Sequence, residues 1–240
     1  MMTTLRTFAL ASQLLLVPAL GALAAPPDAG DLITRAVRRF DALNDYTCVL
    51  TREELIGDKL VRQENIIYKF RKPFSVYMKW TTGKEKGIEV IFPKPGRQDR
   101  LVAHLGKFNI INFTLDPSGR LATKNSRHSI LESPMGYLLT RVKENYELSK
   151  KRGEGQISYG GEELVNGCRT HLFTGKFPET GGYYGSVVLL NFYAENSLPA
   201  RVVVYDPYGR LLEKYEYSEL KVNAGLSDSD FDPQNPAYNF

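Results

Sequence analysis

The sequence predicts a mainly β protein of the α+β class. We expect a strongly curved antiparallel sheet, a half-barrel of about ten strands, with two helices in its concave face. Apolar and polar residues alternate with a period of two in one short run after another across residues 46–220, which is typical of strands with one buried face. The turns between these runs are short, which favours antiparallel neighbours. Only two segments have helical periodicity, and an open sheet of this size curls.

The first segment of the chain has the features of an export signal. Residues 1–24 contain one basic residue, Arg6, followed by an apolar stretch over residues 8–23. The stretch ends in Ala22-Leu23-Ala24, which has the small residues of a signal-peptidase cleavage site. A retained membrane anchor is the alternative, but the apolar run is short for a span of about 20 residues. We therefore expect residues 1–24 to be a cleaved signal peptide, residues 25–240 to form a single domain, and the mature protein to be periplasmic or secreted.

Two segments have the amphipathic pattern of helices. The first extends over about residues 31–43, with Asp31 as its N-cap. The second begins at Ser133 and Pro134, which suit the cap and the first helical position. Each needs an apolar surface to cover, which the concave face of the sheet provides. The apolar stripes are Ile33, Ala36, Val37, Phe40 and Leu43 in the first helix, and Met135, Leu138, Leu139, Val142 and Tyr146 in the second.

One face of the central strands is bulky and apolar. In residues 74–80 every second side chain is large and apolar, and the runs before and after follow the same pattern. These side chains either form the core that the helices cover or line a cavity for an apolar ligand. The candidate ligand-binding residues are Ile66, Tyr68, Phe70, Phe74, Val76, Met78, Trp80, Ile88, Val90 and Phe92, together with Leu138 and Val142 of the second helix.

Two hexapeptides share one turn pattern. Residues 116–121 and 206–211 each place Asp, Pro and Gly where a tight turn needs them. We expect each hexapeptide to connect two paired strands.

The two cysteines, Cys48 and Cys168, lie far apart in strand-like runs of a chain that we expect in an oxidising compartment. A disulfide between them is the favoured interpretation, and two separate buried thiols are the alternative.

The formal net charge of +4 is spread over small clusters such as Lys69, Arg71 and Lys72. A nucleic-acid-binding surface requires a concentrated basic patch, and this positive charge is too weak and too scattered to form one. Nucleic-acid binding is therefore excluded. The clusters are compatible with peripheral contact with an anionic membrane, and we expect a monomer.

Residue types that carry catalysis are poorly placed for it. His104, His128 and His171 lie in separate segments without the close spacing of metal ligands or acid–base pairs. Adjacent carboxylates such as Glu53 and Glu54 point to opposite faces of a strand and cannot share one substrate. No catalytic residue and no cofactor is predicted.

A metal site is not predicted either. Asp228, Asp230 and Asp232 imitate the start of a calcium loop, but Pro233 stands where such a loop requires glycine.

Three stretches resemble those of a known superfamily. Asp45-Tyr46-Thr47-Cys48 follows the first helix, Lys72-Pro73-Phe74-Ser75-Val76-Tyr77-Met78-Lys79-Trp80 gives the clearest strand, and the chain ends in Asp230-Phe231-Asp232-Pro233-Gln234-Asn235-Pro236-Ala237-Tyr238-Asn239-Phe240. With the export signal and the mid-chain helix, they resemble the LolA/LolB superfamily, the periplasmic lipoprotein carrier fold. The resemblance is closest to an uncharacterised family of exported bacterial proteins of that fold, and it covers nearly the whole mature chain.

The resemblance implies a non-catalytic carrier or acceptor that binds lipid or lipoprotein. Its partner would be an acylated ligand or a lipoprotein, with the inner-face residues lining a sleeve for the acyl chain and the two helices acting as a plug. The alternative is an envelope sensory or protein-interaction module of the same fold. That alternative predicts a filled interior and an envelope protein as the partner.

Overall fold

The computed structural model describes residues 25–106 and 111–240, so the expected signal peptide lies outside the described residues. Helix α1 (Ala29–Ala42) precedes the strands and helix α2 (Met135–Arg152) lies among them. The strands are β1 (Asp45–Ile56), β2 (Lys59–Arg71), β3 (Ser75–Trp80), β4 (Ile88–Phe92), β5 (Leu101–Leu105), β6 (Asn112–Leu115), β7 (Gln156–Val165), β8 (Cys168–Lys176), β9 (Val187–Tyr193), β10 (Pro199–Tyr205) and β11 (Leu211–Val222).

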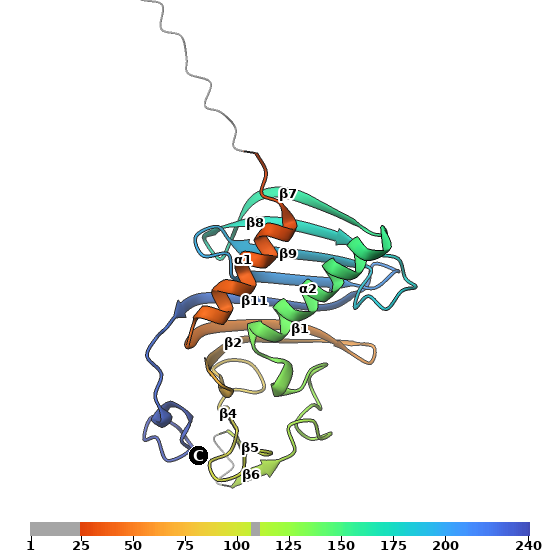
Figure 1. Ribbon diagram of the computed structural model, residues 1–240. Coiled ribbons are helices and arrows are strands. Elements are labelled where there is room, and N and C mark those ends of the chain that lie inside the picture. Colours follow the sequence, from red (N-terminus) through yellow and green to blue (C-terminus); the bar gives the residue numbers. More distant parts are fainter. Residues whose placement is uncertain (1–24, 107–110) are drawn as a thin grey trace, which may run out of the picture.

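All of these strands belong to one antiparallel sheet of 11 strands, in the order β6-β5-β4-β3-β2-β1-β11-β10-β9-β8-β7. The sheet consists of two meanders, β1 to β6 and β7 to β11, that join where β1 pairs with β11. Strands β6 and β7 are its edges, so within the described part of the chain the sheet does not close. The structure confirms the predicted curved half-barrel with two helices (Figure 1).

Each helix has a local signal at one end. The carboxylate of Asp28 accepts a hydrogen bond from the backbone N–H of Asp31 at 3.0 Å, so Asp28 is the N-cap and Asp31 lies in the first turn. Helix α2 ends at Gly153, whose φ of 63° is the left-handed conformation that glycine adopts without strain.

Both helices lie on the same face of the sheet and contact each other (Figure 1). Gly136, in the first turn of α2, permits this contact because a Cβ atom there would collide with the ring of Phe40 in α1. The buried residues Ile33 and Ala36 of α1 pack on β8 to β10, as the apolar stripe predicts, and Leu32, which the predicted stripe did not include, is buried with them.

The opposite, convex face is covered in part by the C-terminal segment. Phe231 and Tyr238 pack against an apolar patch of β3 to β5 that contains Tyr77, Ile91 and Val102. The rings of Tyr77 and Tyr238 are stacked with centroids 4.2 Å apart. The C-terminal segment therefore braces the outside of the sheet, away from the helices (Figure 1).

Acidic residues of this C-terminal segment are paired with cationic side chains of β2. Asp228 lies 2.5 Å from Arg71, and Asp230 lies 2.7 Å from Lys69. The contacts hold the segment against the strand.

Both repeated hexapeptides form turns, but only residues 206–211 connect two strands. Residues 206–211 form the expected turn between β10 and β11, in which Oδ1 of Asp206 accepts the backbone N–H groups of Tyr208 and Arg210. Residues 116–121 also form a turn, with Oδ1 of Asp116 accepting the N–H of Ser118 at 2.9 Å. The prediction of a following strand is wrong there, because residues 120–129 lack the alternation that a strand requires.

The predicted disulfide is not present in the structure. Cys48 and Cys168 are free, with Cys48 buried in β1 and Cys168 exposed at the start of β8. Strands β11, β10 and β9 lie between β1 and β8 in the sheet. Because neighbouring strands are about 4.8 Å apart, the two cysteines are beyond the Cα separation of about 7 Å that a disulfide allows.

Candidate functional site

A cavity lies on the concave face of the sheet, between β3 to β5, α2 and the segment that connects β6 to α2. Its volume is about 300 Å³, at the lower end of the range of about 300–1,000 Å³ for small-molecule sites. We call the connecting segment, residues 116–134, the cover segment, because Pro117, Leu121 and Ile130 line the cavity from it. It contains a short 3-10 helix, η1 (Ile130–Glu132).

Most of the lining is apolar. It comes from both meanders of the sheet, so the cavity bridges the two halves of the half-barrel. The lining includes Met78, Trp80, Ile88, Val90, Leu138 and Val142 of the predicted set, and also Leu101, Ala103, Leu115, Val188, Val202 and Val204.

The rest of the predicted set lies outside this cavity. Phe70 and Phe74 border a second groove, between the end of α1 and the start of α2. Ile66, Tyr68, Val76 and Phe92 are buried in the core. Both alternatives for the inner face therefore apply: the predicted residues of β2 contribute to the core or border the second groove, whereas those of β3 and β4 contribute both core and cavity lining.

The cavity has an apolar neighbour beneath α2. A smaller cavity of about 60 Å³ shares Val142, Asn145 and Val188 with it. The remainder of the smaller lining is mostly apolar and comes largely from the sheet and α1, for example Phe173 and Leu190. Apolar side chains therefore line the two cavities from β4 and β5 to β8 and β9, and we call this shared lining the apolar path.

Polar contacts fasten the cover segment to the sheet. The guanidinium of Arg127 donates to the carbonyl oxygen of Leu55 at 3.0 Å. The hydroxyls of Ser133 and Tyr68 are 2.9 Å apart. Just beyond the segment, the hydroxyl of Tyr46 accepts the backbone N–H of Met135 at 3.0 Å.

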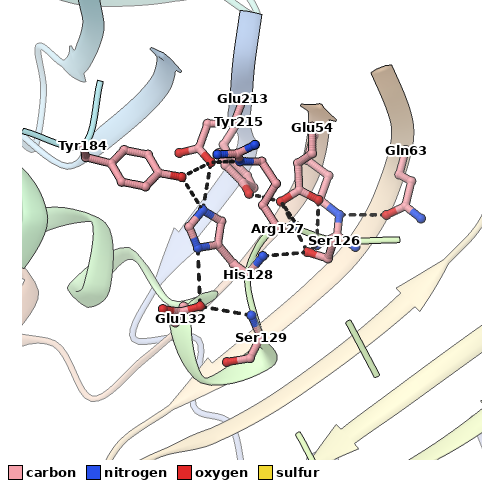
Figure 2. A network of polar contacts seen from close by, with 11 residues as sticks. Glu54, Gln63, Ser126, Arg127, His128, Ser129, Glu132, Tyr184, Glu213 and Tyr215 are labelled. Atoms are coloured by element: carbon pink, nitrogen blue, oxygen red, sulfur yellow. Dashed lines mark hydrogen bonds and ion pairs between the residues drawn. The ribbon is translucent and has the colours of Figure 1, made fainter. Parts of the chain in front are cut away.

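His128 is the centre of this fastening (Figure 2). Its Nε2 lies 2.8 Å from Oε2 of Glu213 in β11 and 2.9 Å from the hydroxyl of Tyr184. Its Nδ1 lies 3.4 Å from Oε2 of Glu132. Burial alone lowers the pKa of His128, but the hydrogen bond and charge of Glu213, with the charge of Glu132, outweigh burial and raise the pKa above the ordinary 6.5.

A second carboxylate, Glu54 of β1, is only 1% exposed and also contacts the cover segment (Figure 2). Its Oε1 accepts from the backbone N–H of Arg127 and the hydroxyl of Ser126, each at 3.3 Å, and from the hydroxyl of Tyr215. The polar network therefore ties the cover segment to β1 and β11 at the point where the two meanders join.

A third group of contacts continues the network into the cavity lining. Nε of Arg52 donates to Oε1 of Gln63 at 2.7 Å, and Nη1 of Arg52 donates to the hydroxyl of Ser126 at 3.0 Å. Arg52, Gln63 and Ser126 all line the cavity.

Sequence reasoning missed this network, because it treated His128 as isolated. The partners of His128 lie 56 and 85 positions away for Tyr184 and Glu213. A signal was present: Glu54 shares the alternation of Cys48 and Leu50, and Glu213 that of Tyr217, so both carboxylates fall on the buried face. A buried carboxylate requires a partner, which the sequence alone did not name.

Two other kinds of site are absent from the described residues. Residues 25–106 and 111–240 contain no cluster of three or more His, Cys, Asp or Glu side chains that could hold a metal ion. In the same ranges, none of the helices combines the length and the apolar character needed to cross a bilayer.

The fold and this site define a class of protein: a curved antiparallel half-barrel with a helix-bounded apolar cavity. The chain belongs to the family described as "Protein of unknown function (DUF1571)", whose model matches residues 43–240. The match agrees with the expected resemblance to an uncharacterised family. No curated protein matches the chain.

Several solved structures are similar to it. The Mycobacterium tuberculosis lipoprotein LppX is 13% identical with a TM-score of 0.49, over 82% of this chain and 96% of that chain. LprF from Mycobacterium bovis is 12% identical with a TM-score of 0.46, over 82% and 94%. The Pseudomonas aeruginosa MucA/MucB complex gives 16% identity and a TM-score of 0.46, over 86% of this chain and only 61% of that chain. Because every one of these scores is below 0.5, the likenesses assign no ligand or partner to this chain.

Proposed function

We propose that this protein is a non-catalytic carrier or acceptor that binds the acyl chain of a lipid or lipoprotein outside the cytoplasm. The single observation that carries the proposal is the apolar cavity on the concave face, bounded by α2 and the cover segment. An acyl chain gains about 0.8 kcal/mol per CH₂ group on leaving water for an apolar environment. A mostly apolar lining of this kind supplies that environment, and a volume of about 300 Å³ suits one chain better than several.

The arrangement of the apolar path supports the same ligand. The smaller cavity continues from Val188 and Val142 toward Phe173 and Leu190. A mostly apolar lining that extends over several strands fits an alkyl chain, whereas a compact polar substrate would leave most of this lining unused.

The contacts of His128 favour a fastening role over catalysis. A general base must have a nitrogen available to take a proton from a substrate. Both nitrogens of His128 face carboxylates, Glu213 and Glu132, and the raised pKa favours the imidazolium form. An imidazolium has two donors and no acceptor, so it holds the cover segment in place and cannot accept a further proton.

Native mass spectrometry of the purified full-length mature protein tests the proposal. We expect a bound lipid or acylated species in a stoichiometry near one, and its release by organic extraction. Val90→Trp places a large ring in the cavity and should abolish the bound species. Ile67→Trp is the matched control, since Ile67 is 38% exposed on the other face of the sheet, in β2. Repeated absence of lipid, also after incubation with lipid vesicles, contradicts the carrier function.

A further inference from the structure

One side chain of the cavity lining carries a buried nitrogen that has no protein partner. Among the described residues, Nε1 of Trp80 is a buried donor without a hydrogen bond. Trp80 is 7% exposed and its side chain lines the cavity. Buried donors in proteins are nearly always paired, so an unpaired one beside a cavity indicates where a ligand acceptor belongs.

Two further donor-bearing side chains line the same end of the cavity. Gln63 is directly opposite Arg52 in the β1–β2 pairing, and the guanidinium carbon of Arg52 lies 5.9 Å from the ring centroid of Trp80. The bond from Arg52 uses the carbonyl oxygen of Gln63. The amide of Gln63 therefore has its NH₂ donors left for a ligand. We call Arg52, Gln63 and Trp80 the donor end.

The charge of the donor end is nearly balanced. Nη1 of Arg52 lies 3.8 Å from Oε2 of the buried Glu54. Because Glu54 offsets the charge of Arg52, the donor end would recognise a ligand mainly through hydrogen-bond donors and less through net positive charge. Such a site favours a carbonyl-type oxygen, whether neutral or charged, and disfavours a cationic group that has only donors of its own.

We infer that the donor end recognises the carbonyl oxygen of the bound amphiphile, in a carboxylate or an ester, while the alkyl chain follows the apolar lining. This inference rests on the proposed function and adds the chemistry and the orientation of the ligand. The polar end lies at Trp80, and the chain passes Ile88 and Val90 and follows the apolar path from there.

Trp80 is the only tryptophan of the chain, so its fluorescence reports directly on the donor end. The full-length mature protein is titrated with dodecanoate, methyl dodecanoate and dodecylamine, which share one chain length. We expect dodecanoate and its methyl ester to bind at least about tenfold more tightly than dodecylamine, since each forms several hydrogen bonds that the amine cannot. Dodecanoate and the ester differ in charge, so their ratio distinguishes a fatty acid from an ester as the natural source.

Two variants test the assigned residues, with affinities measured by calorimetry. Trp80→Phe removes the N–H donor and retains an aromatic, though smaller, side chain, and should lower the preference for carbonyl ligands about 3- to 10-fold. Gln63→Glu replaces the NH₂ donors with an acceptor in the same shape, and should reverse part of the preference toward dodecylamine. Tyr77→Phe is the control: it removes a buried donor from the opposite face of β3, where Tyr77 donates to Glu89 at 2.9 Å, and should leave the preference unchanged.

The outcomes separate the two proposals. Equal affinities for all three amphiphiles, or an unchanged preference in both Trp80→Phe and Gln63→Glu, overturn the donor end and leave the carrier function in place. No binding of any amphiphile overturns both.

Discussion

Nε2 of His128 lies 2.8 Å from Oε2 of Glu213, although the two residues are 85 positions apart in the sequence. His128 belongs to the cover segment and Glu213 to β11, so the contact joins the boundary of the cavity to the sheet (Figure 2). Glu132 on the other side of the imidazole and the hydroxyl of Tyr184 complete its polar surroundings, and Arg127 also pairs with Glu213 at 3.7 Å.

This contact makes stability depend on pH. Because the pKa of His128 is raised above the unfolded-state value of about 6.5, its contribution is complete below about pH 6.5 and is lost as pH rises through the folded-state pKa. We expect the free energy of unfolding, measured with urea, to decrease over that interval. His128→Gln should be less stable than the wild type at pH 6, and the difference between them should shrink as pH rises. A constant difference would contradict an imidazolium at this position.

Removing the carboxylate should loosen the cover segment. Glu213→Gln leaves His128 and Arg127 without their buried anion, and we expect a loss of about 1.5–3 kcal/mol in the free energy of unfolding. Hydrogen exchange in residues 126–133 should accelerate more than exchange in β1. The control is Glu216→Gln on the other face of β11, where Glu216 pairs with Lys214 at 3.0 Å; a partly exposed pair of this kind contributes about 1 kcal/mol or less. Equal effects of the two substitutions would argue against the fastening role.

The two cysteines should differ in reactivity. Cys168 is exposed, whereas burial raises the pKa of the Cys48 thiol and keeps it protonated and inaccessible. We expect a thiol reagent to modify one site in the folded protein and both in urea. Cys168→Ser should abolish the rapid reaction, and Cys48→Ser should leave it unchanged. A folded protein without any reactive thiol, together with an intact crosslink on peptide mapping, would restore the predicted disulfide.

The sequence predicted what local periodicity determines. Alternation and short turns give the strands and their antiparallel neighbours, and the stripe containing Ile33 and Ala36 gives the face on which α1 packs. The pairing of β1 with β11, which joins the two meanders, involves residues such as Leu50 and Tyr217 that are far apart in the chain. No local pattern encodes that pairing, and the error on the disulfide follows directly from it.

The site was predictable only on its apolar side. Met78, Trp80, Ile88 and Val90 follow from period two, since the lining of a cavity and the interior of a core have the same pattern. The cover segment has no period, and its position depends on individual polar contacts such as that between His128 and Glu213. Contacts of this kind are recognisable only once the tertiary structure has brought the partners together.

The C-terminal segment should act as a brace that is independent of the cavity. Tyr238 stacks on Tyr77, accepts a hydrogen bond from Lys69 at 3.0 Å and donates to the carbonyl oxygen of Asp230 at 2.8 Å. We expect Tyr238→Ala to lower the free energy of unfolding by about 1.5–3 kcal/mol, because it removes a partly buried ring and its stacking contact. Tyr208→Ala is the matched control, since Tyr208 is 78% exposed in the turn between β10 and β11, and it should change stability by about 0.5 kcal/mol or less. Because the brace lies on the convex face and the cavity on the concave face, binding of dodecanoate to Tyr238→Ala should equal that of the wild type below the melting temperature. Weakened binding in this variant would show that the two faces of the sheet are coupled.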